Sequence, residues 1–140
     1  MAKARKEVEI AVRLGNRSAA VQEVLSTLAS RGLSVLAYCT YTEQDDLVML
    51  LVTNDALKAK DMLQSAGRSC KANSVVVVGA PHELGSTAAI GAHLGSSGVE
   101  ILYSYTSRLA GAQSIAVFKT TNDDHAIQAL EICPQARAAA

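Results

Sequence analysis

Apolar side chains recur along the chain with two different periods, and the changes between them mark the predicted elements. Residues 8–12 alternate between apolar and mostly polar side chains, which predicts a half-buried strand. Residues 21–28 carry apolar side chains at helical spacing, which predicts an amphipathic helix. Two further strands are expected over 33–41 and 47–52, joined by the polar hairpin loop 43–46.

A second helix and a long strand complete this series. Thr53-Asn54-Asp55 has the chemistry of a helix N-cap, and Gly67 is a typical end for the helix that follows. The consecutive valines 75–78 form the most apolar run of the chain, inside a strand predicted over 71–80. The resulting order of strand, helix, strand, strand, helix and strand is that of a ferredoxin-like βαββαβ unit.

The sequence repeats this pattern once. A slide of 66 residues superposes the apolar positions of 10–35 on those of 76–101, and it places Gly32 on Gly98. A shared glycine at a helix end is stronger evidence than shared apolar positions, which often match by chance. Repeats of this kind indicate two copies of one structural unit.

Further along, a slide of 68 places the tripeptide 53–55 on the identical tripeptide 121–123. The two additional residues then fall in the loop 107–111. We therefore predict an α+β fold of two tandem ferredoxin-like βαββαβ units, 1–73 and 74–140, each with an antiparallel sheet and its helices on one face.

The second copy is shorter than the first. Only about ten residues follow Leu130, and they include Pro134 and an alanine-rich tail, so its last strand is expected to be lacking or reduced. We hypothesise that the strand over 71–80 closes the first sheet and also opens the second.

Composition narrows the possible functions. The formal net charge is zero and aromatic residues make up 4% of the chain, which argues against nucleic-acid binding. No apolar run approaches the ~20 residues of a membrane span, so we expect a cytoplasmic protein without membrane contact. The three cysteines and three histidines lack the spacing of a metal site, so neither a metal nor a cofactor is expected.

The two strand–loop–helix junctions resemble those of the ACT domain family. The first copy reads Asn-Arg-Ser-Ala-Ala-Val over 16–21 and Gly-Leu-Ser-Val over 32–35; the second reads His-Glu-Leu-Gly-Ser-Thr over 82–87 and Gly-Val-Glu-Ile over 98–101. The resemblance covers residues 7–131. It implies a non-catalytic regulatory module that binds a small-molecule effector, expected to be an amino acid, and that forms a homodimer.

The resemblance also implies the ligand site, at the loops and at unit or subunit interfaces. The candidate ligand-binding residues lie in the two loops and at the starts of the strands that follow the helices: Asn16, Arg17, Ser18, Ser34, His82, Glu83, Leu84, Gly85, Ser86 and Glu100. The family usually has Pro-Gly where the first loop has Ser18-Ala19, whereas the second loop keeps Gly85. The second loop is therefore expected to be the better site, because glycine permits close backbone approach.

A loop that leads into a helix suits an amino-acid ligand. The first N–H groups of a helix lack intrahelical partners and favour a carboxylate, while Glu83 or Glu100 could accept from the ammonium group. In the first copy, Asn16 and Ser18 could instead only cap the helix. Two other functions stay open: an acylphosphatase-type enzyme, for which Arg17 is a partial match, and a purely structural protein-interaction module.

Overall fold

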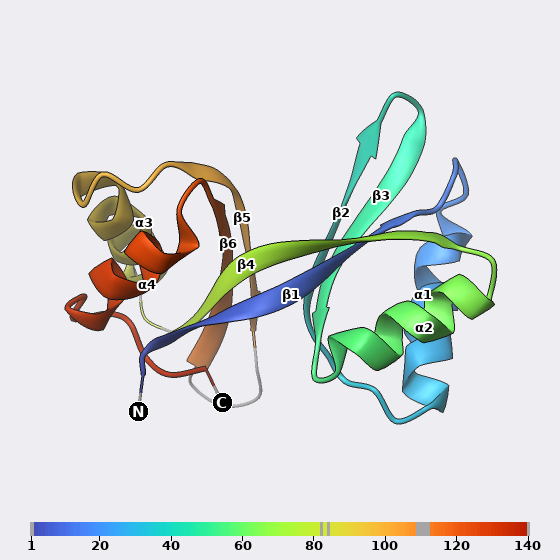
Figure 1. Cartoon of the computed structure of the whole chain (residues 1–140), viewed down its shortest axis with the longest axis horizontal. Helices are drawn as coiled ribbons and strands as arrows, with labels where there is room; N and C mark the ends of the chain where they lie inside the picture. Colours follow the sequence, from blue (N-terminus) through green and yellow to red (C-terminus); the bar gives the residue numbers. More distant parts are fainter. Residues whose placement is uncertain (1, 82, 84, 109–112, 140) are drawn as a thin grey trace. The chain divides into compact units, whose positions relative to one another are not determined.

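The computed structural model describes residues 2–81, 83, 85–108 and 113–139. Contacts divide the chain into a first unit, Val8–Asn73, and a second unit, Met1–Glu7 together with Ser74–Ala140 (Figure 1). The elements follow in the order β1 (Ala4–Arg13), α1 (Ala19–Ser30), β2 (Val35–Glu43), β3 (Asp46–Thr53), α2 (Ala56–Ser65), β4 (Ser69–Pro81), α3 (Ser86–Ser96), β5 (Ile101–Arg108), β6 (Gln113–Thr120) and α4 (Asp123–Glu131).

The strands are hydrogen-bonded in the order β2-β3-β1-β4-β6-β5. The pairs β1–β3, β2–β3, β4–β6 and β5–β6 are antiparallel. Together with the four helices, this confirms the predicted α+β fold of tandem ferredoxin-like units.

Two long strands, β1 and β4, contribute residues to both units. The first unit contains most of β1 and the start of β4, whereas the second contains residues 4–7 of β1 and most of β4. In the second unit, the start of β1 lies beside β4, where a fourth strand of the second copy would lie. The limits 1–73 and 74–140 stay a prediction, and the contacts add that the start of β1 serves the second unit.

Each unit has its own hydrophobic core between its helices and one face of its strands. The first core is formed by alternate residues of β1 and β3 and by one side of α1 and α2, including Ile10, Val12, Met49, Leu51, Val24, Leu28, Ala59 and Leu63. The second core has the same construction, from Val76, Val78, Ala116, Phe118, Ile90, Leu94, Ala126 and Leu130. Burial of every second strand residue against the helices is the pattern that the sequence predicts.

The structural repeat has a different offset from the predicted one in its second half. The N-cap of α2 is Asp55, which accepts from the Lys58 N–H at 3.1 Å, and that of α4 is Asn122, which accepts from the His125 N–H at 3.1 Å. Asp55 and Asn122 are separated by 67 residues, as are the buried Leu63 and Leu130. The predicted slide of 68 is therefore wrong, because the two Thr-Asn-Asp tripeptides occupy positions that differ by one residue.

The C-terminal tail docks on the end of β4. The N–H groups of Gly79 and Arg137 each donate to the other residue's carbonyl at 2.7 Å, forming an isolated antiparallel bridge. The Gln113 Nε2 donates to the Ala138 carbonyl at 2.9 Å, and the Ala136 side chain is fully buried. Among the described residues after α4, this bridge is the extent of sheet pairing.

Candidate functional site

The loop between β1 and α1 is anchored to the start of β3. The Leu14 N–H donates to the Leu47 carbonyl at 2.8 Å, and the Leu47 N–H donates to the Gly15 carbonyl at 2.6 Å. Gly15 has φ +69°, a left-handed conformation that glycine adopts without steric cost. The loop is therefore held against the β2–β3 hairpin before it turns into α1.

A cavity of about 540 Å³ lies at this junction. Asn16 and Ser18 line it from the loop, and Thr42, Asp45 and Leu47 line it from the hairpin. The volume is within the range of small-molecule sites, ~300–1,000 Å³. The cavity offers a carboxylate, two hydroxyls and an amide beside one aliphatic side chain, which is a lining suited to a small polar ligand.

The polar side chains from the loop have no structural partner in the described part of the chain. Ser18 is the N-cap residue of α1, but its side chain makes no capping hydrogen bond, and φ −64° and ψ −28° give it a helical rather than an extended backbone. The alternative that Asn16 and Ser18 only cap the helix is therefore not what the structure contains. The N–H groups of Ser18 and Ala19 also lack an acceptor among the described residues.

Asp45 lies at the tip of the β2–β3 hairpin in a costly backbone conformation. Gln44 and Asp45 have φ +50° and +64°, as a two-residue type I′ turn requires, although such turns favour asparagine and glycine. A left-handed conformation costs an ordinary residue ~1–2 kcal/mol. The turn directs the hairpin end, and Asp45 with it, toward the cavity.

Arg13 holds the hairpin in register with the end of β1. Its guanidinium donates to Asp46 Oδ2 at 2.8 Å and to Glu43 Oε1 at 2.8 Å, one carboxylate from each side of the turn. The hydrogen bonds to Asp46 and then to Glu43 raise the pKa of Arg13. The clamp fixes the hairpin wall of the cavity relative to the loop wall.

Arg17 points to a structural partner rather than to the cavity. Its guanidinium donates to Glu23 Oε1 at 2.7 Å, and Arg68 donates to the other oxygen of Glu23 at 2.8 Å. An acylphosphatase-type anion site would require this guanidinium to face a bound phosphate. Engagement with Glu23 removes the partial match that suggested such an enzyme.

We expect Glu23→Gln to lower the midpoint of thermal unfolding at neutral pH but not at acidic pH. The hydrogen bond and charge of Arg17, followed by those of Arg68, lower the pKa of Glu23 in the folded state. The ionised carboxylate therefore stabilises the fold above its unfolded pKa of about 4.3, and this stability is lost as pH falls through the lower folded value. Thermal unfolding between about pH 3 and pH 8 measures the difference.

The control for this prediction is Asp61→Asn, because Asp61 has no ion pair within the described residues. Its difference from the wild type should not depend on Arg17 or Arg68. A Glu23→Gln difference that stayed constant below pH ~4 would contradict the assignment, since the protonated carboxyl resembles the amide.

Ser34 and Glu100 lie away from the loops of their own units. The Ser34 N–H donates to Asn54 Oδ1 at 3.0 Å, and its carbonyl accepts from the Asn54 N–H at 3.1 Å. The Glu100 carbonyl accepts from the Thr121 N–H at 3.2 Å. The physical reason is topological: each helix carries the chain back, so the second strand starts at the sheet end opposite the loop. The structure does not bring either residue to the loop of its own unit.

The second loop is described in part. Gly85 has φ +83° and is the N-cap of α3, Ser86 is buried at 6% exposure, and the Glu83 N–H donates to the Pro81 carbonyl at 2.9 Å. His82 and Leu84 lie outside the described residues. The preference for this loop over the first stays a prediction.

Thr42, Asp45 and Leu47 are the cavity residues that sequence reasoning missed. The strands β1 and β2 run parallel on either side of β3, so the end of β1 and the β2–β3 turn lie at the same edge. The predicted hairpin loop 43–46 could therefore have been placed beside Asn16 from the βαββαβ order alone.

Other kinds of site receive no support from the described residues. They contain no group of three or more histidine, cysteine or acidic side chains that could hold a metal ion. No helix among them is long and apolar enough to cross a bilayer. Burial raises the pKa of the Cys39 and Cys70 thiols, which favours the unreactive protonated form.

The comparisons with known proteins agree in fold. The family model of the ACT domain pair matches residues 7–133. Protein BT0572 from Bacteroides thetaiotaomicron is similar at 24% identity and TM-score 0.79, over 91% of this chain and 88% of that one. The regulatory subunit of aspartate kinase from Thermus thermophilus, in a ligand-free form, is similar at 15% identity and TM-score 0.67, over 94% and 97%. No curated protein matches the chain.

Proposed function

The chain belongs to the family of ACT domain pairs, and from this premise we propose that it is a non-catalytic regulatory module that binds a free amino acid. The observation that carries the proposal is the cavity of about 540 Å³ between the β1–α1 loop and the β2–β3 hairpin. The resemblance to a regulatory subunit of aspartate kinase supports a regulatory role in the same proposal.

The cavity presents complementary groups for the two charged ends of an amino acid. The unpartnered N–H groups of Ser18 and Ala19, at the positive end of the α1 dipole, suit the α-carboxylate. The Asp45 carboxylate and the Thr42 hydroxyl suit the α-ammonium, and Leu47 offers an apolar contact for the ligand side chain. The amide of Asn16 can serve either end, because it both donates and accepts.

A regulatory role also requires that the ligand distinguish two states of an assembly. We propose a homodimer, since the strand order leaves β2 and β5 as sheet edges and β2 exposes Tyr38 at 41% and Tyr41 at 43%. Occupancy of the cavity would shift the assembly only by the difference in ligand affinity between its two states.

We expect one or more of the twenty amino acids to raise the thermal midpoint, and Asp45→Asn to weaken that ligand about 10- to 100-fold. Loss of a charged hydrogen-bond acceptor costs ~1.5–3 kcal/mol of binding free energy. A ligand at 100 times its Kd should stabilise the fold by ~2.7 kcal/mol. A thermal-shift screen identifies the ligand, and isothermal titration calorimetry then compares the variants.

The matched control is Glu83→Gln, which removes one negative charge from the second loop. It should leave the affinity unchanged if the first loop binds the ligand. The reverse ranking would assign the ligand to the second loop, and no stabilisation by any amino acid would overturn the proposed ligand class.

A further inference from the structure

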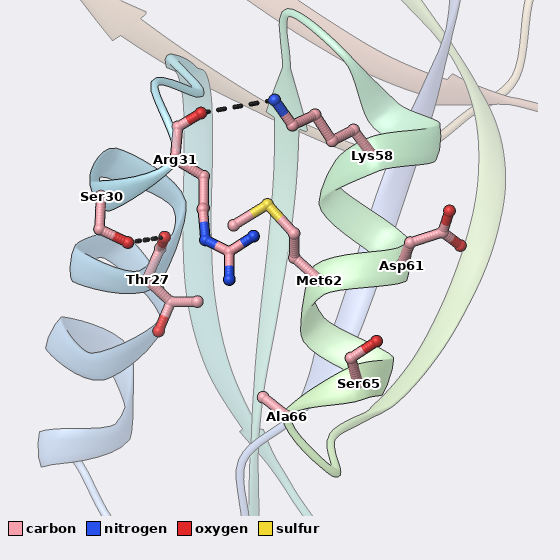
Figure 2. A pocket seen from close by; sticks show the side chains of 8 residues that line it. All are labelled: Thr27, Ser30, Arg31, Lys58, Asp61, Met62, Ser65 and Ala66. Carbon is pink, nitrogen blue, oxygen red and sulfur yellow. Dashed lines mark hydrogen bonds between the residues drawn. The ribbon is translucent and has the colours of Figure 1, made fainter.

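A second cavity, of about 520 Å³, lies in the first unit between α1 and α2. Its walls include Thr27, Ser30 and Arg31 from the last turn of α1 and Lys58, Met62 and Ser65 from α2 (Figure 2). We call this cavity the helix groove. It shares no lining residue with the cavity at the β1–α1 loop.

The guanidinium of Arg31 lies in the helix groove beside Met62 (Figure 2). It makes no hydrogen bond or ion pair within the described part of the chain. Every other arginine with a described side chain binds a carboxylate or a carbonyl: Arg5, Arg13, Arg17, Arg68 and Arg137. Arg31 therefore offers the planar donor fork that suits a carboxylate or phosphate, with all of its donors unused.

The other polar groups of the helix groove also leave donors in excess. Lys58 Nζ makes one long hydrogen bond, 3.5 Å, to the Arg31 carbonyl, so two of its hydrogens are unused. The Ser65 hydroxyl has no partner among the described residues. Thr27 and Ser30 donate to the Glu23 and Thr27 carbonyls, at 2.8 and 2.7 Å.

Charge points in the same direction. Asp61 also lines the helix groove, but its carboxylate is directed away from the Arg31 guanidinium, on the far side of α2 (Figure 2). The carbonyls at the C-terminal end of α1 disfavour an anion, and Lys58 Nζ offsets this by bonding to one of them. Two cations thus face the groove against one carboxylate that is turned outward.

The second unit provides an internal comparison. There the positions equivalent to Thr27, Arg31 and Met62 are His93, Ser97 and Ala129, by the slides of 66 and 67. His93 Nε2 donates to the Ala129 carbonyl at 2.7 Å and so links α3 to α4 directly. The cationic groove is therefore a property of the first unit and not of the βαββαβ scaffold.

From this geometry we propose that the helix groove binds a small oxyanion ligand, a carboxylate or a phosphate, through Arg31 and Lys58. The guanidinium forms the bidentate contact, and Lys58 and Ser65 donate to the remaining oxygens. The site goes beyond the amino-acid cavity, since it lies on different elements and requires no ammonium acceptor.

The test uses inorganic phosphate and succinate as separate probes, at constant ionic strength maintained with chloride. Two-dimensional amide NMR follows each titration, and saturable shifts are expected at residues 30–33 and 58–66. The expected Kd is on the order of 1–10 mM, because exposed ion pairs contribute little to binding. The probe with the tighter constant identifies the oxyanion class.

Arg31→Ala should weaken the tighter probe at least ~10-fold, and Arg31→Lys about 3-fold, because lysine keeps the charge but loses the fork. The control is Arg68→Ala, which removes the same charge from the same unit and should not change the Kd. Equal effects of Arg31→Ala and Arg68→Ala, or shifts that do not saturate, would overturn the proposal. So would binding of an acidic peptide with no response to either small probe.

Discussion

Removal of residues 2–7 is expected to lower the free energy of unfolding by about 4 kcal/mol. Residues 4–7 of β1 lie beside β4 in the second unit, and each net backbone hydrogen bond contributes ~1 kcal/mol. The deletion also exposes the core around Ala4, which is 3% exposed. It removes the bonds from Lys3 Nζ to the Cys133 carbonyl at 3.0 Å and from Arg5 to the Ala139 carbonyl at 2.7 Å.

Urea denaturation of the shortened and full-length chains measures this loss, and hydrogen exchange locates it. Amides of β4 over 74–81 should lose protection, while those of β3 keep more of theirs. Lys6→Ala is the control, because the exposed pair from Lys6 Nζ to Asp124 Oδ1, 2.9 Å, should contribute less than about 1 kcal/mol. Equal stability of the shortened and full-length chains would show that β4 does not depend on the start of β1.

Gly79→Ala is expected to destabilise the fold by ~1–3 kcal/mol, as overpacking of a tight site does. A Cβ at this position would lie 2.9 Å from the Arg137 carbonyl oxygen and 3.1 Å from that of Ala138, and it would also meet Gln113 Nε2. The glutamine could move, but the two carbonyls belong to the backbone that pairs with Gly79. The methyl group must therefore displace the C-terminal tail from β4.

The matched control is Gly91→Ala in α3, where an added Cβ meets nothing within 4 Å. A glycine inside a helix costs ~0.5–1 kcal/mol relative to alanine, so this substitution should stabilise the protein. Opposite signs are therefore expected for the two glycines in the same denaturation experiment. A neutral Gly79→Ala, with the tail signals unchanged in NMR, would contradict the packing described for this end of β4.

Much of the fold could be predicted because its signals are local. The periodicity of 21–28, the glycines at helix ends and the caps before α2 and α4 each reflect interactions within a few residues. The partner of a strand is a different matter, because pairing joins segments far apart in the sequence and leaves no period of its own. Residues 4–7 therefore read as the start of one unit although they serve the other.

The candidate site was predictable in part for the same reason. Asn16 and Ser18 follow from the resemblance at the loop, and both line the cavity. Asp45 is near them only because the β2–β3 turn lies at the same sheet edge, which depends on strand order. Arg31 gave no signal, since an arginine in the last turn of a helix is ordinarily read as dipole stabilisation.

The sharing of β1 between units sets the timing of folding during synthesis. The start of β1 leaves the ribosome about 70 residues before its partner over 74–81, an interval of roughly 4–15 s at ~5–20 residues per second. Throughout that interval the strand has an unsatisfied edge, and the first unit cannot acquire its final strand until β4 emerges. Chaperone protection of the nascent chain should therefore matter most between the completion of α1 and the emergence of β4.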